Sequence, residues 1–152
     1  MRGAIRRRSD ARGALTRLCA AAMLLSVLGA PAAAGPVVQG VATLRQGDVF
    51  DLDRGRLGVI ETADIARVRI SADKEALVPR PGALIGLRGD RSPDEASCRK
   101  AQFSERGVLM HRLRPGRYFC IRTGEGRMAA LRVLKAPIRG RGQLTLEHRT
   151  FR

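Results

Sequence analysis

The sequence predicts a mainly β protein, a single antiparallel β-sandwich that carries one short helix and one disulfide. Three observations lead to this fold class. Short apolar segments alternate with polar residues, and glycine, proline or aspartate interrupts them about every ten residues. One segment has the capping pattern of a helix. Two cysteines remain once a predicted export signal is removed, which favours a disulfide.

Residues 1–34 have the pattern of a cleaved signal peptide. A basic head, MRGAIRRRSDARGALTR, precedes the apolar run LCAAAMLLSVLGA, which is shorter than a membrane-spanning helix needs. The small residues Ala32, Ala33 and Ala34 then predict cleavage after Ala34, with a retained anchor as the alternative. Cleavage removes Cys19 and predicts an exported product, periplasmic or extracellular, without a transmembrane span.

The expected product, residues 35–152, has the length of one domain with one core. Six of the 29 basic residues and one of the 14 acidic residues lie in the signal, so the product has 23 basic and 13 acidic residues and a formal net charge of +10. Such a charge attracts polyanions. The chain has no tryptophan, one tyrosine and four phenylalanines, too few for a base-stacking surface, so sequence-specific nucleic-acid binding is not expected.

Strands account for most of the expected domain. In IARVRIS, Ala66, Val68 and Ile70 are predicted to face the core and Arg67 and Arg69 the solvent, because successive strand residues point to opposite faces. The expected strands are 37–44, 48–52, 56–60, 65–71, 83–87, 108–113, 117–122, 127–134 and 144–149.

Two segments depart from this pattern. SPDEASCRKAQF predicts a short helix with Ser92 as the N-cap, Pro93 at the first position and Glu95 three residues after the cap, which places Cys98 in the helix. The final segment, residues 140–152, alternates like an edge strand but also has the arginines and glycines of a loose tail.

The remaining cysteines, Cys98 and Cys120, are predicted to form a disulfide in an oxidising compartment rather than to act as nucleophiles. They are 22 residues apart. For a loop of that length the chain-entropy treatment gives roughly 3 kcal/mol of stabilisation.

Residues 118–128, YFCIRTGEGRM, predict a hairpin that turns at residues 124–126. With the preceding LRPGR, Tyr118 two residues before Cys120 resembles the tyrosine corner of immunoglobulin-like sandwiches, over Leu113–Val133. The resemblance implies an immunoglobulin-like or fibronectin-type sandwich. The chain departs from that family in having no tryptophan and in having its two cysteines close together.

A second resemblance spans most of the expected domain. The segments FDLDRGRLG, ADIARV and YFCIRTGEGRMAALRV are similar to those of small exported bacterial proteins of unassigned function, which have an F-D-x-D-x-G strand and turn and a C-x-R-T-x-x-G-R hairpin. This resemblance implies export and implies no activity.

Candidate chemistry is sparse. Asp48, Asp51 and Asp53 form an oxygen-rich segment, GDVFDLDRG, that suits calcium, but the spacing fails the EF-hand pattern, so turn-forming and ion-paired aspartates are the interpretation and no metal is predicted. His111 is predicted to be half-buried on a strand, and His148 to lie in a charged tail. No nucleophile, zinc or phosphate-loop motif is present, so no catalytic residue and no cofactor are predicted.

These observations leave three hypotheses about function. The first is a noncatalytic exported domain that binds a protein or cell-surface partner through strand edges or loops. The second is a basic envelope protein that binds polyanions, such as lipopolysaccharide or an anionic wall polymer, through outward arginines including Arg67, Arg69 and Arg132. The third is a hydrolase that uses the segment of Asp48, Asp51 and Asp53.

Overall fold

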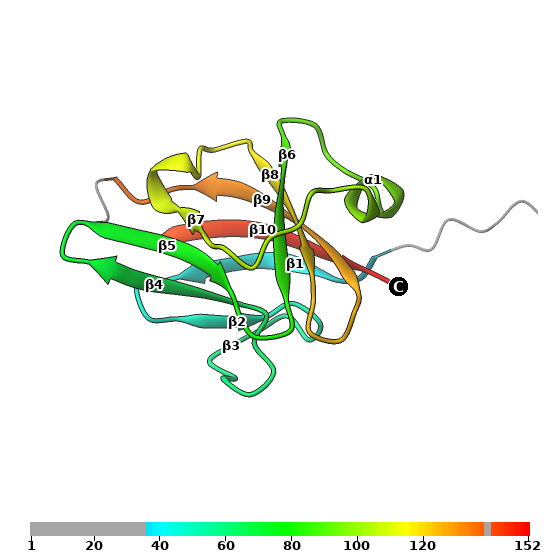
Figure 1. Ribbon diagram of the computed structural model, residues 1–152, viewed down its shortest axis with the longest axis horizontal. Coiled ribbons are helices and arrows are strands. Elements are labelled where there is room, and N and C mark those ends of the chain that lie inside the picture. Colours follow the sequence, from blue (N-terminus) through cyan, green and yellow to red (C-terminus); the bar gives the residue numbers. More distant parts are fainter. Residues whose placement is uncertain (1–35, 139–140) are drawn as a thin grey trace, which may run out of the picture. The chain divides into compact units, whose positions relative to one another are not determined.

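The computed structural model describes residues 36–138 and 141–152, which belong to one compact unit of two antiparallel sheets around a shared core (Figure 1). The predicted signal peptide and Cys19 lie outside the described residues. The mainly β class, the two antiparallel sheets, the short helix and the single disulfide are confirmed.

Sheet A has five strands in the order β1-β10-β9-β8-β6. Their bounds are β1 Pro36–Leu44, β10 Leu144–Phe151, β9 Met128–Lys135, β8 Tyr118–Arg122 and β6 Leu84–Gly89. The expected edge strand or tail at residues 140–152 is wrong, because β10 lies between β1 and β9 and pairs with both.

Sheet B has the order β3-β2-β4-β5-β7. Its strands are β3 Arg56–Leu57, β2 Val49–Asp51, β4 Ile65–Ser71, β5 Lys74–Pro79 and β7 Val108–Leu109. Sequence reasoning missed β5, which begins with a charged pair and ends at a proline. The expected strand at residues 108–113 is shorter than predicted, because a 3-10 helix, η1, follows β7 over Met110–Arg112.

The core between the sheets is built from strand residues that alternate inward. The fully buried members come from both sheets, so the two sheets close on one another. They include Leu44, Leu52, Ile65, Leu77, Leu113, Phe119, Ile121, Leu131, Val133 and Leu144.

The helix, α1, spans Glu95–Arg99 and starts two residues later than expected. Asp94, not Ser92, is the N-cap, and its carboxylate accepts a hydrogen bond from the Ser97 amide at 2.7 Å. Ser92 is instead engaged by Arg149, whose guanidinium also donates to the Pro93 carbonyl. Pro93 is therefore fixed before the helix rather than inside it.

The disulfide between Cys98 and Cys120 joins α1 to β8. Both cysteines are fully buried, in a small second cluster with Met128, Ala130 and Phe151. This cluster lies on the face of sheet A that points away from the shared core, since Phe119, Ile121, Ala129 and Leu131 occupy the other face. The helix therefore covers part of the outer face of sheet A.

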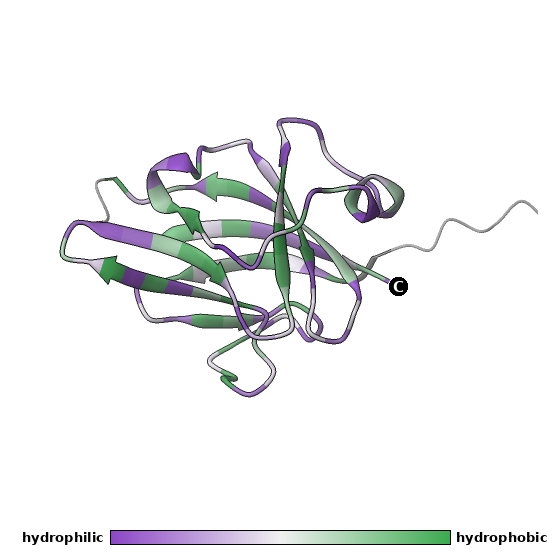
Figure 2. Ribbon diagram, in the orientation of Figure 1, coloured by the Kyte–Doolittle hydropathy of each residue, from purple (hydrophilic) through white to green (hydrophobic). Residues whose placement is uncertain are grey.

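Strand β4 is oriented opposite to the prediction for IARVRIS. Arg67 is 1% exposed and lies opposite Leu77 of the core, whereas Ile70 is 58% exposed. Polar and apolar residues do alternate along β4, as Figure 2 shows, but the prediction of which face meets the core is wrong. Period-two alternation defines two faces without stating which one is buried.

Buried contacts explain why Arg67 points inward. Its guanidinium donates to the Glu75 carboxylate at 2.6 and 3.0 Å. It also donates to the Leu44 carbonyl at 3.0 Å and to the Gly142 carbonyl at 2.8 Å. Glu75 is itself only 7% exposed. One side chain of sheet B thus holds the end of β1 and the segment before β10, both of sheet A.

Candidate functional site

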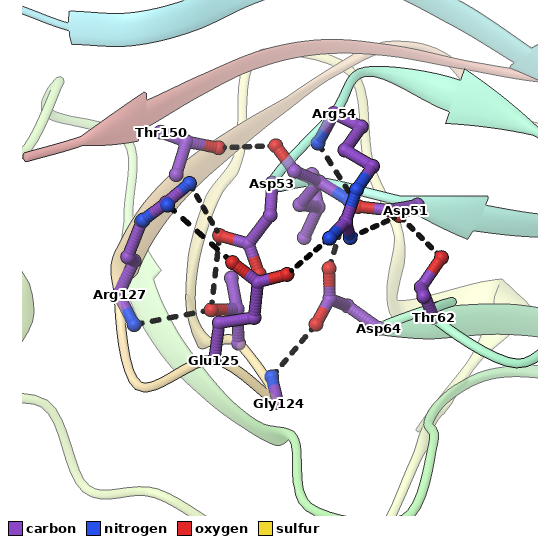
Figure 3. Close-up of polar contacts among 11 residues, drawn as sticks. Asp51, Asp53, Arg54, Thr62, Asp64, Gly124, Glu125, Arg127 and Thr150 are labelled. Carbon is purple, nitrogen blue, oxygen red and sulfur yellow. Dashed lines mark hydrogen bonds and ion pairs between the residues drawn. The ribbon is translucent and has the colours of Figure 1, made fainter.

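Three buried aspartates converge where the turn after β2 meets the β8–β9 hairpin (Figure 3). Asp51, Asp53 and Asp64 are at most 5% exposed. One carboxylate oxygen from each lies within 4.8 Å of the others. We call these three residues the aspartate cluster.

Asp51 ends β2 and holds the following turn. Its carboxylate accepts hydrogen bonds from the Arg54 amide at 2.9 Å, the Arg54 guanidinium at 3.0 Å and the Thr62 hydroxyl at 2.5 Å. Arg54 also forms an ion pair with Glu125 of the hairpin turn at 2.7 Å. Asp51 therefore orders the turn that places Asp53 and Arg54 against sheet A.

Asp64 crosses between the two sheets. Its carboxylate accepts the Leu52 amide and the Gly124 amide, both at 2.8 Å. Gly124 belongs to the β8–β9 turn, which closes between Thr123 and Arg127 and uses Gly126 at a φ of 83°. A carboxylate that accepts two backbone amides fixes the relative position of the two chain segments.

Asp53, in the turn after β2, completes the cluster and contacts the β8–β9 hairpin of sheet A. The Thr123 hydroxyl donates to its carboxylate at 3.2 Å, and the Arg127 guanidinium lies 3.5 Å from the same oxygen. Nearby, the Thr150 hydroxyl of β10 donates to the Leu52 carbonyl at 2.7 Å. Asp53 is thus held by residues of the β8–β9 hairpin.

The candidate segment of Asp48, Asp51 and Asp53 does not form one cluster. Asp48 caps a separate turn, where its carboxylate accepts the Arg45 amide at 2.6 Å. Asp51 and Asp53 do converge, and Asp64 is the third member of their cluster. Sequence reasoning missed Asp64, because its partner Gly124 is 60 residues away and no local motif marks it.

The three carboxyl groups of the aspartate cluster differ in the direction of their pKa shifts. Burial raises the pKa of Asp64 to about 6, against the lowering effect of the Gly124 and Leu52 amides. Burial also raises the pKa of Asp53 more than the Thr123 hydrogen bond lowers it. For Asp51, burial acts to raise the pKa, but the hydrogen bonds from Thr62 and Arg54 together outweigh it and keep the pKa below its usual value.

The cluster has the oxygen chemistry of a site for a hard cation, and the raised pKa of Asp64 is of the kind found in acid–base catalysts. Its carboxylates, however, are occupied by internal N–H and O–H donors that join the two sheets. None of the three lines the cavities described below. Its geometry accounts for a structural cross-link, and neither a cation nor a hydrolytic step is assigned to it.

The raised pKa of Asp64 predicts a pH-dependent stability. A carboxyl group whose pKa is higher in the folded than in the unfolded state stabilises the fold at low pH. This stabilisation is complete below the unfolded pKa of 3.8 and is lost as the pH rises through about 6, the folded pKa. The free energy of unfolding of the wild type, relative to Asp64→Asn, should therefore fall by about 2 kcal/mol between pH 4 and pH 7. Urea unfolding of both proteins across this range measures the difference, and a pH-independent difference would contradict the assignment.

Both histidines differ from expectation. His111 is exposed on the 3-10 helix η1 rather than half-buried on a strand. His148 is 4% exposed on β10, packed edge-on against Phe50 with ring centroids 5.0 Å apart. A side chain at Gly40 would put Cβ 3.1 Å from its Nε2, so a glycine there makes room for the ring. Its Nδ1 has no partner, and burial lowers the pKa of His148, so it stays neutral inside the fold.

The orientation of β4 places a row of apolar residues on the side of sheet B away from the core, of which Ile70 is exposed and the alanines are buried. Residues that pair across its strands on the side away from the core are Val49 with Ala66, Ala66 with Val78, Val68 with Ala76, and Ala76 with Leu109; Ile70 continues the row. The buried alanines among them are not part of the shared core. We call these seven residues the outer face of sheet B. None of the seven residues belongs to the shared core, so packing within that core does not explain why the outer face is apolar.

The arginines proposed as outward contacts lie in three different settings. Arg67 is buried, which is contrary to expectation. Arg69 is exposed and donates to the Gln46 side chain at 2.6 Å. Arg132 lies over the Tyr118 ring at 5.8 Å and 3.6 Å from the Glu147 carboxylate. Arg132 borders a shallow groove of about 500 Å³ on sheet A.

Comparison with known proteins finds no matching family, no matching curated protein and no matching solved structure. Within residues 36–138 and 141–152, no helix combines the length and the hydropathy that a bilayer crossing requires.

Proposed function

We propose that this protein is an exported, noncatalytic β-sandwich domain that binds an acidic protein partner through the outer face of sheet B. The observation that carries the proposal is the inward orientation of Arg67, which leaves Val68 and Ile70 on the outside. A contiguous apolar sheet face on an exported domain is the kind of surface that a partner covers. Ile70 is 58% exposed, and the half-buried Val68 and Val78 beside the buried alanines extend the apolar surface that a partner would cover.

The charge of the chain favours an acidic partner over a second copy. The full sequence carries a formal net charge of +15, and +10 is expected after signal removal, so two copies repel each other. Lys74 is exposed at one end of the outer face, on the same side of β5 as Ala76 and Val78. An acidic rim on the partner would complement this charge and accelerate association.

A photo-crosslinking residue at position 74, in the chain expressed in its native host, tests the proposal. We expect one acidic protein to be crosslinked. Ile70→Lys should reduce the yield by about tenfold or more, because a cation replaces the most exposed apolar side chain of the face, close to position 74. The matched control is Val41→Lys on sheet A, because Val41 is 63% exposed and Ile70 is 58% exposed. The control should leave the yield unchanged.

Three results would refute this function. They are the absence of an adduct, an adduct that Ile70→Lys and Val41→Lys weaken equally, and an adduct between two copies of this chain. Thermal unfolding of both variants must stay close to that of the wild type, which is expected because surface substitutions usually change stability by less than about 0.5 kcal/mol.

Polyanion binding is a second candidate function. It is supported by exposed arginines without a carboxylate partner among the described residues, such as Arg88, Arg122 and Arg152. Binding to heparin, lipopolysaccharide and DNA across a salt titration separates the two functions. Discriminating binding that persists near physiological salt supports a polyanion role, whereas weak binding to all three that disappears with modest salt leaves only background charge.

We also propose an immunoglobulin-like origin for the sandwich and export of the protein. An immunoglobulin-like origin is supported by the position of Tyr118 at the start of β8, two residues before Cys120. Export is supported by the buried disulfide, which persists in oxidising compartments. N-terminal sequencing of the protein recovered outside the cytoplasm tests export and the cleavage after Ala34.

A further inference from the structure

A cavity borders the shared core, because its lining includes Phe119 of the core and Val108, which packs against it. It has a volume of about 580 Å³ and is lined by residues from β6, β7, η1 and β8. Leu87 and Phe119 are paired across β6 and β8, so both point to the inner side of sheet A. Phe119 is fully buried, whereas Leu87 is 55% exposed. Val108 of β7 packs against the core from the other side.

The rim of this cavity is cationic. Arg112, Arg114 and Arg117 line it together with His111, and no lining residue is acidic. The side chains of Arg112 and Arg114 are exposed and make no ion pair or hydrogen bond with any residue that the structure describes. Arg117 alone has a carboxylate nearby, that of Asp90, at 3.4 Å. The positive charge at the rim is therefore largely uncompensated.

We propose that this cavity binds an anionic amphiphile with a single apolar chain, whose carboxylate or phosphate is held by Arg112 and Arg114 and whose chain lies on Leu87. The volume falls within the range of small-molecule sites, which combine apolar walls with a few polar groups that orient the ligand. Guanidinium groups bind carboxylate and phosphate through two parallel hydrogen bonds.

This site shares one residue, Leu109, with the outer face of sheet B. Its other apolar lining residues lie elsewhere, because Leu87 and Phe119 belong to sheet A and Val108 points to the core. The site therefore extends the proposed function and does not depend on it. The ligand could come from a free fatty acid or from the alkyl phosphate part of a lipid, and the probes below distinguish these two sources.

Isothermal titration calorimetry on the full-length chain tests the site with four probes, each below its micelle-forming concentration. Decanoate and decyl phosphate carry both chain and charge, decanol carries only the chain, and inorganic phosphate carries only the charge. We expect the two anionic amphiphiles to bind at least about tenfold more tightly than decanol or phosphate. Preference between carboxylate and phosphate then distinguishes the two ligand sources.

Variants locate the binding. Arg112→Gln with Arg114→Gln should lower the affinity for both anionic amphiphiles by about tenfold or more, since each ligand loses charge-assisted hydrogen bonds. Arg88→Gln with Arg122→Gln removes two exposed arginines that do not line the cavity and should change nothing. Leu87→Asn should weaken the amphiphiles and leave phosphate unaffected.

Several outcomes would overturn the proposal. Absence of amphiphile binding would do so, as would equal affinity for decanol, which would indicate a purely apolar site. Equal affinity for inorganic phosphate would indicate a simple anion site. Equal weakening by both arginine pairs would indicate general attraction to a basic protein.

Discussion

Arg67→Ala is expected to lower the free energy of unfolding by about 3–5 kcal/mol. Replacing this arginine leaves the Glu75 carboxylate buried without its partner, and the carbonyls of Leu44 and Gly142 each lose a donor. Because these contacts connect sheet B to one end of the β1–β10 pair, where Leu44 lies opposite Leu144, the loss affects the packing of the two sheets. Equilibrium unfolding in urea measures the change.

Two variants make this expectation specific. Arg69→Ala removes the same charge from the exposed position two residues further along β4 and should change stability by less than about 0.5 kcal/mol. Arg67→Met combined with Glu75→Leu removes both buried charges, and this protein should be more stable than Arg67→Ala alone. If Arg67→Ala cost no more than Arg69→Ala, the buried ion pair would have no role in the fold.

Loss of the disulfide has the second large expected effect. Cys98→Ala with Cys120→Ala should lower the free energy of unfolding by roughly 3 kcal/mol, the chain-entropy value for 22 residues. The bond also fastens α1, a helix of five residues that is too short to persist without tertiary contacts. Its release exposes the cluster of Met128, Ala130 and Phe151 on sheet A.

Chemical reduction provides the control for this variant. A reductant should destabilise the wild type by an amount similar to the double substitution and should leave the doubly substituted protein unchanged. Reduction of the wild type without a measurable shift in its unfolding midpoint would mean that the two cysteines contribute only through packing.

The fold class was predictable because its signals are local. Alternation in Val37 to Leu44 and Leu144 to Arg149, together with turns at glycine and proline, located most strands. The cysteine pairing followed from count and compartment. Strand β5 was missed because its first two residues are charged, although Glu75 is in fact the buried partner of Arg67. The charged residues at the start of β5 indicated a solvent-exposed segment, whereas Glu75 forms a buried ion pair with Arg67.

The candidate sites were less predictable because they are assembled from distant segments. Asp64 meets Gly124 across 60 residues, and Thr123 meets Asp53 across 70. No spacing rule in one sequence connects such positions. The cavity has the same character, since Leu87 lies on β6 and Arg112 and Arg114 follow β7. The outer face of sheet B depended on which side of β4 is buried, and alternation leaves that choice open.

Solvent exposure of the isoleucine and leucine methyl groups reports the orientation of β4, which determines both the buried contacts of Arg67 and the proposed docking face. A soluble gadolinium chelate broadens the methyl NMR signals of exposed side chains. This orientation of β4 predicts strong broadening for Ile70, which is 58% exposed, and little for Ile65 and Leu77, which are fully buried. Protection of Ile70 to the level of Leu77 in the isolated protein would contradict it, because β4 would then turn its apolar side toward the core.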